Sequence, residues 1–240
     1  MRVLILGHKG MLGHMVHKYF LDNKVDCVTL LDKFPSPEFT DSVIKFNGDF
    51  IVNCIGNIPQ RTNHFNINFE LPIWLERSTN IPIIHPGTDC EMDSDDYGIS
   101  KLKARDFIVN TGTHTKIIKT SIIGPELQSN FSLMNWFLST KDTEVNGYTQ
   151  SMWNGNTTLE WAKECYMMLY NFSTYPIETI LEGKCVSKFE LLNYINDIFD
   201  KQIKINPKDV GLINKCLVGN RKTSHIETQL MELKQYYYGM

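Results

Sequence analysis

A tyrosine and a lysine stand four residues apart in the segment Tyr97-Gly98-Ile99-Ser100-Lys101. On a helix, residues i and i+4 share one face, so both side chains can address one bound molecule. Reduction of a ketone needs a proton donor at oxygen while hydride reaches carbon, and a phenol can supply that proton. A nearby ammonium favours phenolate, so we expect Lys101 to lower the pKa of Tyr97 toward neutrality. The pair therefore indicates carbonyl reduction.

A hydroxyl and a carboxylate, Thr88 and Asp89, come shortly before this pair and directly after an apolar run. If that run is a parallel strand, Thr88 lies at the carboxyl edge of the sheet, where ligands bind. Its hydroxyl would then bond the substrate oxygen; a turn threonine beside Asp89 is the alternative. The acidic run before Tyr97 is expected to be a solvated turn, with Asp95 or Asp96 capping the next helix.

Three glycines at positions 7, 10 and 13 follow the first apolar run and open a helical pattern. In a dinucleotide-binding turn the first permits a tight turn, the second lets the backbone approach a pyrophosphate, and the third lets the helix pack against the strand. The positive helix end attracts the phosphates. A glycine-rich turn without ligand is the alternative, but the strand–loop–helix context favours a dinucleotide. The residues predicted to bind it are Gly7, Lys9, Gly10, Met11, Leu12 and Gly13.

Asp32 is the candidate contact for the adenosine end of the cofactor. It follows the second apolar run, 19 residues after Gly13. A carboxylate there can accept hydrogen bonds from the ribose hydroxyls, which favours NAD(H). Lys9 and Lys33 would instead neutralise the 2′-phosphate of NADP(H). A solvated turn carboxylate is the alternative for Asp32, and the choice between NADH and NADPH stays open.

Short apolar runs alternate with helix-length segments over the first two-thirds of the chain, as in βαβ units. Strands are expected at 3–6, 27–31, 50–55, 81–85 and 116–123, with helices at 10–21, 65–77 and 97–109. Helices at 131–139, 159–170, 188–199 and 226–236 and strands at 179–181 and 202–205 follow. Pro72 is expected to kink the helix at 65–77 or to open a new first turn.

The predicted fold is α/β, a Rossmann-type doubly wound parallel sheet with a small C-terminal substrate lobe. The dinucleotide-binding domain would comprise 1–125 and about 156–182. The smaller lobe would comprise about 126–155 and 183–240.

Composition narrows the class of protein. A net charge of −3 without any Lys/Arg-rich run argues against a nucleic-acid partner, and no apolar stretch is long enough to span a membrane. Six scattered cysteines without a CxxC pair predict reduced thiols and a cytoplasmic location. His14 and His17 share a helix face without a carboxylate or cysteine partner, so no metal site is predicted. A homodimer is compatible with the sequence.

In order along the chain, the GxxGxxG loop, Thr88-Asp89, Tyr97-x-x-x-Lys101 and the segment 119–125 resemble the extended short-chain dehydrogenase/reductases. Within them, the likeness is to the dTDP-4-dehydrorhamnose reductase branch of sugar-nucleotide reductases. It covers 1–125 and continues more loosely through 153–158 and the C-terminal helices. It implies a catalytic triad of Thr88, Tyr97 and Lys101, with Lys101 also binding the nicotinamide ribose.

The resemblance implies NAD(P)H-dependent reduction of a nucleotide-linked 4-keto-6-deoxysugar, in deoxysugar or polysaccharide biosynthesis. It places Asn53, Cys54 and Gly56 along the cofactor groove, although Asn53 and Gly56 could equally belong to a strand-end turn. It places Asp89, Trp153 and Asn154 at the sugar nucleotide, although a tryptophan is more commonly a core residue. Lys119 and Thr120 either face the pocket or are buried in a strand. Only nine positions separate Thr88 from Tyr97, fewer than is usual in the family, which predicts a more open pocket.

Two other functions stay open. One is a sugar-nucleotide epimerase or dehydratase, in which Asp89 would act as acid or base, although the neighbouring glutamate expected of a dehydratase is absent. The other is a non-catalytic NAD(P)-binding regulatory subunit, which the shortened segment favours and the Thr88, Tyr97 and Lys101 set disfavours.

Overall fold

The computed structural model describes residues 1–239 and consists of two compact units. The first contains Met1–Lys119 and Trp161–Thr179, and the second contains Thr120–Glu160 and Ile180–Met240. The borders expected from the sequence, near 125, 156 and 182, lie a few residues from these.

A parallel sheet forms the centre of the first unit. Its strands are β1 (Arg2–Leu6), β2 (Asp26–Thr29), β3 (Phe50–Asn53), β4 (Ile83–Gly87) and β5 (Thr115–Lys119), in the order β2-β1-β3-β4-β5. Each neighbouring pair among them is parallel. β10 (Glu178–Glu182) and then β14 (Arg221–Lys222) extend the sheet to seven strands. Because β2 and β3 lie on opposite sides of β1, the winding reverses there, which confirms the predicted doubly wound fold.

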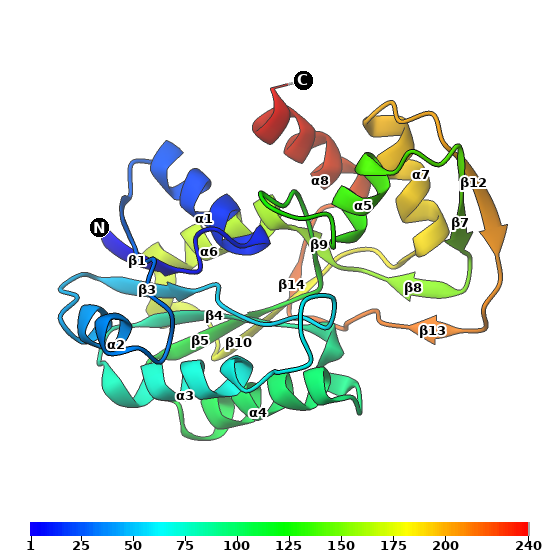
Figure 1. Ribbon diagram of the computed structural model, residues 1–240. Helices are drawn as coiled ribbons and strands as arrows, with labels where there is room; N and C mark the ends of the chain where they lie inside the picture. The colour runs from blue at the N-terminus through cyan, green and yellow to red at the C-terminus, as the bar shows by residue number, and fades with distance from the viewer. Residues whose placement is uncertain (240) are drawn as a thin grey trace. The chain divides into compact units, whose positions relative to one another are not determined.

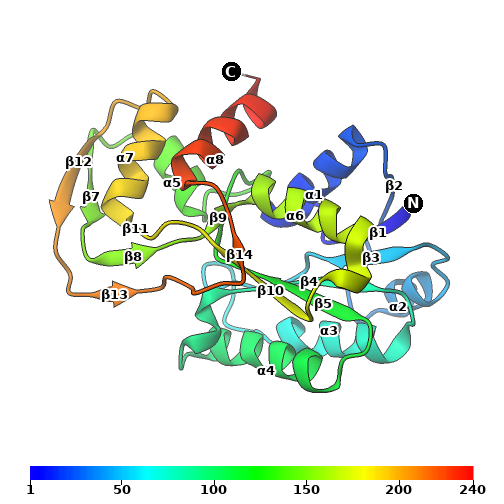
Figure 2. The same ribbon diagram turned by 180° about the vertical axis from the view of Figure 1, so that it is seen from behind.

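Helices cover both faces of this sheet. α1 (Met11–Asp22) and α6 (Thr158–Asn171) lie on one face (Figure 1). α2 (Pro37–Ile44), α3 (Ile67–Ser78) and α4 (Asp96–Thr111) lie on the other, as the view from behind also shows (Figure 2). α3 runs through Pro72 without a break, so this proline does not open a new helix.

α2 was not predicted from the sequence, and its capping and its buried side chains explain why it forms. Ser36 begins α2 by accepting a hydrogen bond from the Phe39 amide at 3.2 Å, and Pro37 follows at the first helical position. Phe39 and Val43, one turn apart, are fully buried. The core cluster consists of Leu4, Leu6, Phe39, Val43, Ile51, Leu71, Leu75 and Ile83.

The fifth strand expected at 116–123 is in fact two strands. β5 ends at Lys119, and β6 (Ile122–Ile123) pairs with β9 (Asn156–Thr157) in the second unit. Between them, the Thr120 hydroxyl donates to the Ser121 carbonyl at 3.0 Å, a local side-chain bond of the kind that competes with strand pairing. The prediction of one continuous strand was therefore wrong.

The second unit is built from short pieces. Its strands include β7 (Glu144–Tyr148) beside β12 (Lys204–Lys208), and β8 (Ser151–Trp153) between β11 (Val186–Ser187) and β13 (Ile213–Asn214). Its helices include α5 (Leu133–Ser139), α7 (Lys188–Ile198) and α8 (Ile226–Leu233), followed by a π-helical turn at Lys234–Tyr238. Short 3₁₀ turns lie in the first unit at Asp89–Met92 and Phe172–Thr174.

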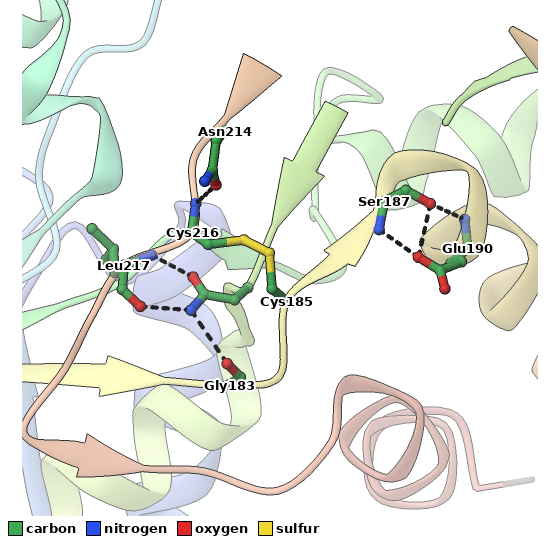
Figure 3. Close-up of a disulfide and its surroundings, with 8 residues drawn as sticks. Gly183, Cys185, Ser187, Glu190, Asn214, Cys216 and Leu217 are labelled. Atoms are coloured by element: carbon green, nitrogen blue, oxygen red, sulfur yellow. Dashed lines mark hydrogen bonds between the residues drawn. A yellow bond between two sulfur atoms is a disulfide. The ribbon is translucent and has the colours of Figure 1, made fainter. Parts of the chain in front are cut away.

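A disulfide joins Cys185 and Cys216 in the second unit (Figure 3). The prediction that the cysteines are reduced was wrong for these two; the free ones are Cys27, Cys54, Cys90 and Cys165. The bonded pair is 31 positions apart, so only the folded lobe brings the sulfur atoms together. Within residues 1–239, no helix combines the length and the apolar composition needed to cross a bilayer.

Candidate functional site

The glycine loop of the first unit forms a tight turn between β1 and α1. Gly7 has a φ of +77°, and the Gly10 amide donates to the Gly7 carbonyl at 2.9 Å. Gly10 caps α1 without any side-chain hydrogen bond, and the first turn of α1 contains no acidic residue. The amides and the positive dipole at this helix end are therefore well suited to an anion such as a pyrophosphate.

The other predicted residues of the loop surround this helix end. Leu12 is buried, Met11 is half-buried and Lys9 is exposed. The rings of His8 and His17 are 5.9 Å apart, and burial lowers the pKa of both. Since both imidazoles are then neutral at pH 7, Lys9 is the charged side chain of the loop.

Two candidate adenosine contacts lie beyond the second strand. β2 ends at Thr29, and both Asp32 and Lys33 follow as exposed residues. An exposed carboxylate and an exposed ammonium next to each other can both reach a bound ligand, so the structure keeps both cofactor preferences open.

The end of β3 holds three further predicted cofactor residues. Asn53 is fully buried; its Nδ2 lies 3.2 Å from His85 Nδ1, and its Oδ1 accepts the Ile55 amide at 3.1 Å. The backbone of Cys54 lies against Gly7, where a Cβ would be 2.9 Å from the Cys54 carbonyl group. Gly56 is exposed. The side chain of Asn53 thus holds strand ends together, and contact of this segment with a cofactor stays a prediction.

Thr88 follows β4 and is half-buried at the carboxyl edge of the sheet. Its hydroxyl donates to Asp89 Oδ1 at 3.0 Å and accepts the Cys90 amide at 3.3 Å. The Thr88 side chain also lowers the pKa of Tyr97. The two residues named as catalytic on the basis of the resemblance are therefore neighbours.

α4 supplies Tyr97 and Lys101 from its first two turns. Asp95 caps the helix by accepting the Gly98 amide at 2.6 Å, which confirms the predicted cap. The Tyr97 ring contacts Phe65, with centroids 5.7 Å apart. Lys101 is buried and its Nζ donates to the Pro86 carbonyl at 2.9 Å, so the ammonium sits beneath the end of β4.

The electrostatics of Tyr97 differ from the expectation. Burial raises the pKa of Tyr97 strongly, nearby Cys90 and two carboxylates raise it further, and the Thr88 side chain lowers it. The Lys101 ammonium, which was expected to lower this pKa, instead donates to the Pro86 carbonyl and is not among the main influences on Tyr97. The phenol is therefore protonated at neutral pH, which is the state that a proton donor needs.

Part of the acidic run before α4 is buried. Asp89 and Glu91 lie in the 3₁₀ turn with almost no solvent exposure, whereas Met92 beside them is 82% exposed. Glu91 Oε2 lies 2.6 Å from Lys119 Nζ, and both side chains are buried. The prediction of a wholly solvated turn was wrong for these carboxylates, because a lysine from β5 reaches one of them. The Thr88-x-x-Glu91 spacing, a capping-box pattern, is the signal that could have identified Glu91.

The predicted substrate contacts Trp153 and Asn154 are buried within the second unit. Lys188 Nζ lies 4.7 Å from the centroid of the Trp153 ring. The Asn154 amide binds the Leu217 backbone at both its N–H and its carbonyl, each at 2.8 Å, and donates to the Gly183 carbonyl at 3.2 Å. Both residues stabilise this unit, and a contact with a sugar nucleotide stays a prediction.

Among known proteins, only solved structures resemble this chain. No family model matches the sequence, and no curated protein does. The dTDP-4-dehydrorhamnose reductase of Bacillus anthracis, solved with NADP, matches with a TM-score of 0.79 at 14% identity over 98% of this chain and 99% of that one. The UDP-glucose 4-epimerase of Thermotoga maritima, solved with UDP-glucose, matches with a TM-score of 0.76 at 12% identity over 100% and 99%.

A third solved structure, the dTDP-glucose 4,6-dehydratase of Bacillus anthracis with NAD, has a TM-score of 0.73 at 14% identity over 100% of this chain and 97% of that one. The chain has the fold of these enzymes. The resemblance noted in the sequence is thereby confirmed for the fold. A shared fold does not establish an activity, which depends on the residues of the site.

Proposed function

We propose that the chain is an NAD(P)H-dependent oxidoreductase of the short-chain dehydrogenase/reductase type that reduces a nucleotide-linked 4-keto-6-deoxysugar. The observation that carries the proposal is that Tyr97 and Thr88 are neighbours at the carboxyl end of β4, where Thr88 lowers the pKa of Tyr97. The uncapped start of α1, in the same unit, supports it. So do the neighbours solved with NADP or NAD, whose names refer to dTDP sugars.

The residues of the first unit fit a dinucleotide. Gly10 and the first amides of α1 would hold the pyrophosphate, with Gly7 and Gly13 shaping the turn. Lys9 and Asp32 would address the adenosine end. Residues 53–56 and Lys101 would lie toward the nicotinamide. When bound, the reduced cofactor supplies the hydride.

The chain's own part in the reaction is to provide and stabilise a proton donor. Tyr97, protonated at neutral pH, donates its proton to the substrate oxygen as negative charge develops there. The neighbouring Thr88 hydroxyl, which donates to Asp89 in this structure, would turn its proton toward the phenolate that results and stabilise it. The buried Lys101 ammonium, one helical turn from Tyr97, adds a positive charge to this edge of the sheet. Asp89, Trp153 and Asn154 are the proposed substrate contacts.

One observation favours a related reaction. The Asp89 carboxylate is 3.0 Å from the Thr88 hydroxyl, so an acid or base stands beside the proposed reaction centre. An epimerase or dehydratase would use such a group. Incubation with NAD⁺ and dTDP-glucose or UDP-glucose, followed by chromatography of the sugar nucleotides, distinguishes the two: a new epimer or a 4-keto product would replace the reductase proposal.

The decisive experiment is NADPH and NADH oxidation with a panel of dTDP- and UDP-linked 4-keto-6-deoxysugars. We expect turnover with the wild type and a loss of at least about 100-fold in Tyr97→Phe, with cofactor affinity unchanged. Tyr148→Phe, which removes an exposed hydroxyl in the second unit, is the control and should keep full activity. Equal rates for wild type and Tyr97→Phe would remove Tyr97 from the mechanism. Saturable cofactor binding without turnover across the panel would instead favour a regulatory subunit.

The proposed location is the cytoplasm, as the sequence analysis expected. A cytoplasmic thiol pool would then act on the Cys185–Cys216 bond, which is accessible at Cys185.

A further inference from the structure

Glu91 and Lys119 form a buried ion pair directly beneath the proposed reaction centre. Glu91 is 2% exposed and Lys119 is 7% exposed, and their charged atoms are 2.6 Å apart. Burying two charges costs desolvation energy that their attraction does not reliably recover, so such a pair is weak evidence for a purely stabilising role. Its position close to Thr88 indicates another purpose.

The second carboxylate oxygen of Glu91 holds the backbone of Thr88. Glu91 Oε1 accepts the Thr88 amide at 3.0 Å, while the Thr88 hydroxyl accepts an amide from the same 3₁₀ turn. These reciprocal bonds form a capping box. Glu91 therefore fixes the residue that neighbours Tyr97.

A glycine makes room for this arrangement. Gly87 is the register partner of Lys119 across β4 and β5. A Cβ on Gly87 would lie 3.0 Å from the Lys119 Cβ and 3.1 Å from Glu91 Oε1. The same Cβ would lie 2.9 Å from Ile117 Cγ2, so any larger residue at position 87 would force these side chains to shift. The missing side chain at Gly87 thus leaves space for Glu91 and for Lys119 on the neighbouring strand.

The charge of Glu91 also acts on the catalytic lysine. Burial lowers the pKa of Lys101, and the negative charge of Glu91 raises it again. Glu91 likewise raises the pKa of Tyr97. Both effects keep these groups protonated, the state in which Tyr97 can donate and Lys101 carries a positive charge.

The other titratable groups around Lys101 and Tyr97 come from the same turn and from β4. Cys90 and Asp89 lie on the turn and raise the pKa of Tyr97. His85 on β4 is fully buried and its pKa lies well below the usual value, so it is neutral at the pH of the experiments below. Glu91 is the carboxylate in this group that is bonded to both Thr88 and Lys119.

We propose that Glu91 is a positioning residue for the reduction: it holds Thr88 through its backbone and, balanced by Lys119, places a negative charge next to Lys101. The effect on the reaction rests on the proposed function. The contact of Glu91 with Thr88 and its charge beside Lys101 do not depend on that function.

The kinetic test compares wild type, Glu91→Gln, Lys119→Met and the double variant in single-turnover NADPH oxidation as a function of pH. Glu91→Gln keeps an oxygen for the Thr88 amide but loses the charge. We expect its alkaline limb to move to lower pH by roughly one unit, because Lys101 loses its proton earlier without the negative charge of Glu91. The rate at neutral pH should fall about tenfold while cofactor affinity stays within about twofold.

The double variant separates positioning from stability. It has no unpaired buried charge, so it should unfold at nearly the wild-type temperature, yet its alkaline limb should remain at the lower pH. If the double variant regains the wild-type pH profile, the pair is merely structural and the inference fails. Glu38→Gln, which removes an exposed carboxylate on α2, is the control and should leave the profile unchanged.

A second readout needs no substrate. In protein labelled with ¹³C-lysine, the titration of Lys101, assigned with Lys101→Met, should move to lower pH in Glu91→Gln, and the Thr88 amide resonance should shift. An unchanged Lys101 titration would overturn the inference. If the wild type turns over no substrate while these NMR shifts occur, the proposed function fails, and only the structural part of the inference stands: Glu91 holds Thr88 and acts on Lys101.

Discussion

A Cβ atom on Gly13 would lie 2.2 Å from the carbonyl oxygen of Gly7, so the first turn of α1 packs directly against the end of β1. This contact sets the start of α1 at the turn that is proposed to receive the pyrophosphate. Gly10 differs, because the nearest atom to a Cβ there is the same Gly7 oxygen at 3.4 Å, an ordinary contact. The two glycines can therefore be tested separately.

Gly13→Ala should destabilise the protein by about 1–3 kcal/mol, since the clash is with backbone that cannot move away cheaply. Gly10→Ala should leave the free energy of unfolding nearly unchanged and still weaken NADPH binding at least about tenfold, because its methyl group would meet the phosphates. Urea denaturation and cofactor fluorescence titration measure the two effects. Normal NADPH affinity in Gly10→Ala would place the dinucleotide elsewhere.

Asp95→Ala removes the cap of α4, the helix that carries both Tyr97 and Lys101. The free energy of unfolding should fall by about 1 kcal/mol, the usual value of such a cap, and Asp95→Asn should lose much less because its amide oxygen can still accept the Gly98 amide. Denaturant midpoints of the two variants check this. Equal losses in both would show that the carboxylate charge, rather than the cap bond, matters here.

Glu76 connects the end of α3 to the segment that leads into β5. Its carboxylate accepts hydrogen bonds from Thr113, from the Thr115 hydroxyl and from the His114 amide. Burial alone raises the pKa of Glu76, but these hydrogen bonds lower it overall from the usual 4.5. A lowered pKa in the folded state means that the stabilisation is complete above pH 4.5 and is lost as the pH falls through the folded value.

Glu76→Gln should therefore lower the free energy of unfolding by about 1–3 kcal/mol at pH 7. The difference from wild type should narrow below about pH 4.5, where the wild-type carboxyl becomes protonated. Thermal unfolding between pH 3 and 7 tests this, with Glu70→Gln on the exposed side of α3 as the control. A difference that does not depend on pH would contradict the role of the charge.

The disulfide of the second unit closes a loop between positions 31 residues apart. In the chain-entropy description, reduction or Cys216→Ser should lower the free energy of unfolding by about 3–4 kcal/mol. Unfolding with and without dithiothreitol measures the change, and the double Cys→Ser variant should not respond to the reductant. Detection of six free thiols by alkylation of the native protein would refute the bond.

Local patterns in the sequence were sufficient for the framework of the first unit. Apolar runs ending at Gly7 and near Asn53 predicted β1 and β3, because strands buried on both faces are continuously apolar. The i, i+4 spacing of Tyr97 and Lys101 and the Asp95 cap depend on neighbours within one helical turn. Such features require no knowledge of the rest of the fold.

What the sequence could not determine depends on residues far apart along the chain. Glu91 is paired with Lys119, 28 positions away. The burial of Tyr97, together with Cys90, Asp89 and Glu91, raises the pKa of Tyr97, opposite to the lowering that the spacing of Tyr97 and Lys101 suggested. Cys185 and Cys216 are bonded only because the folded lobe brings their segments together. Residue types and spacing determined which groups can react. Their protonation states and partners depend on burial and on charges from distant parts of the sequence, and these arise only in the tertiary structure.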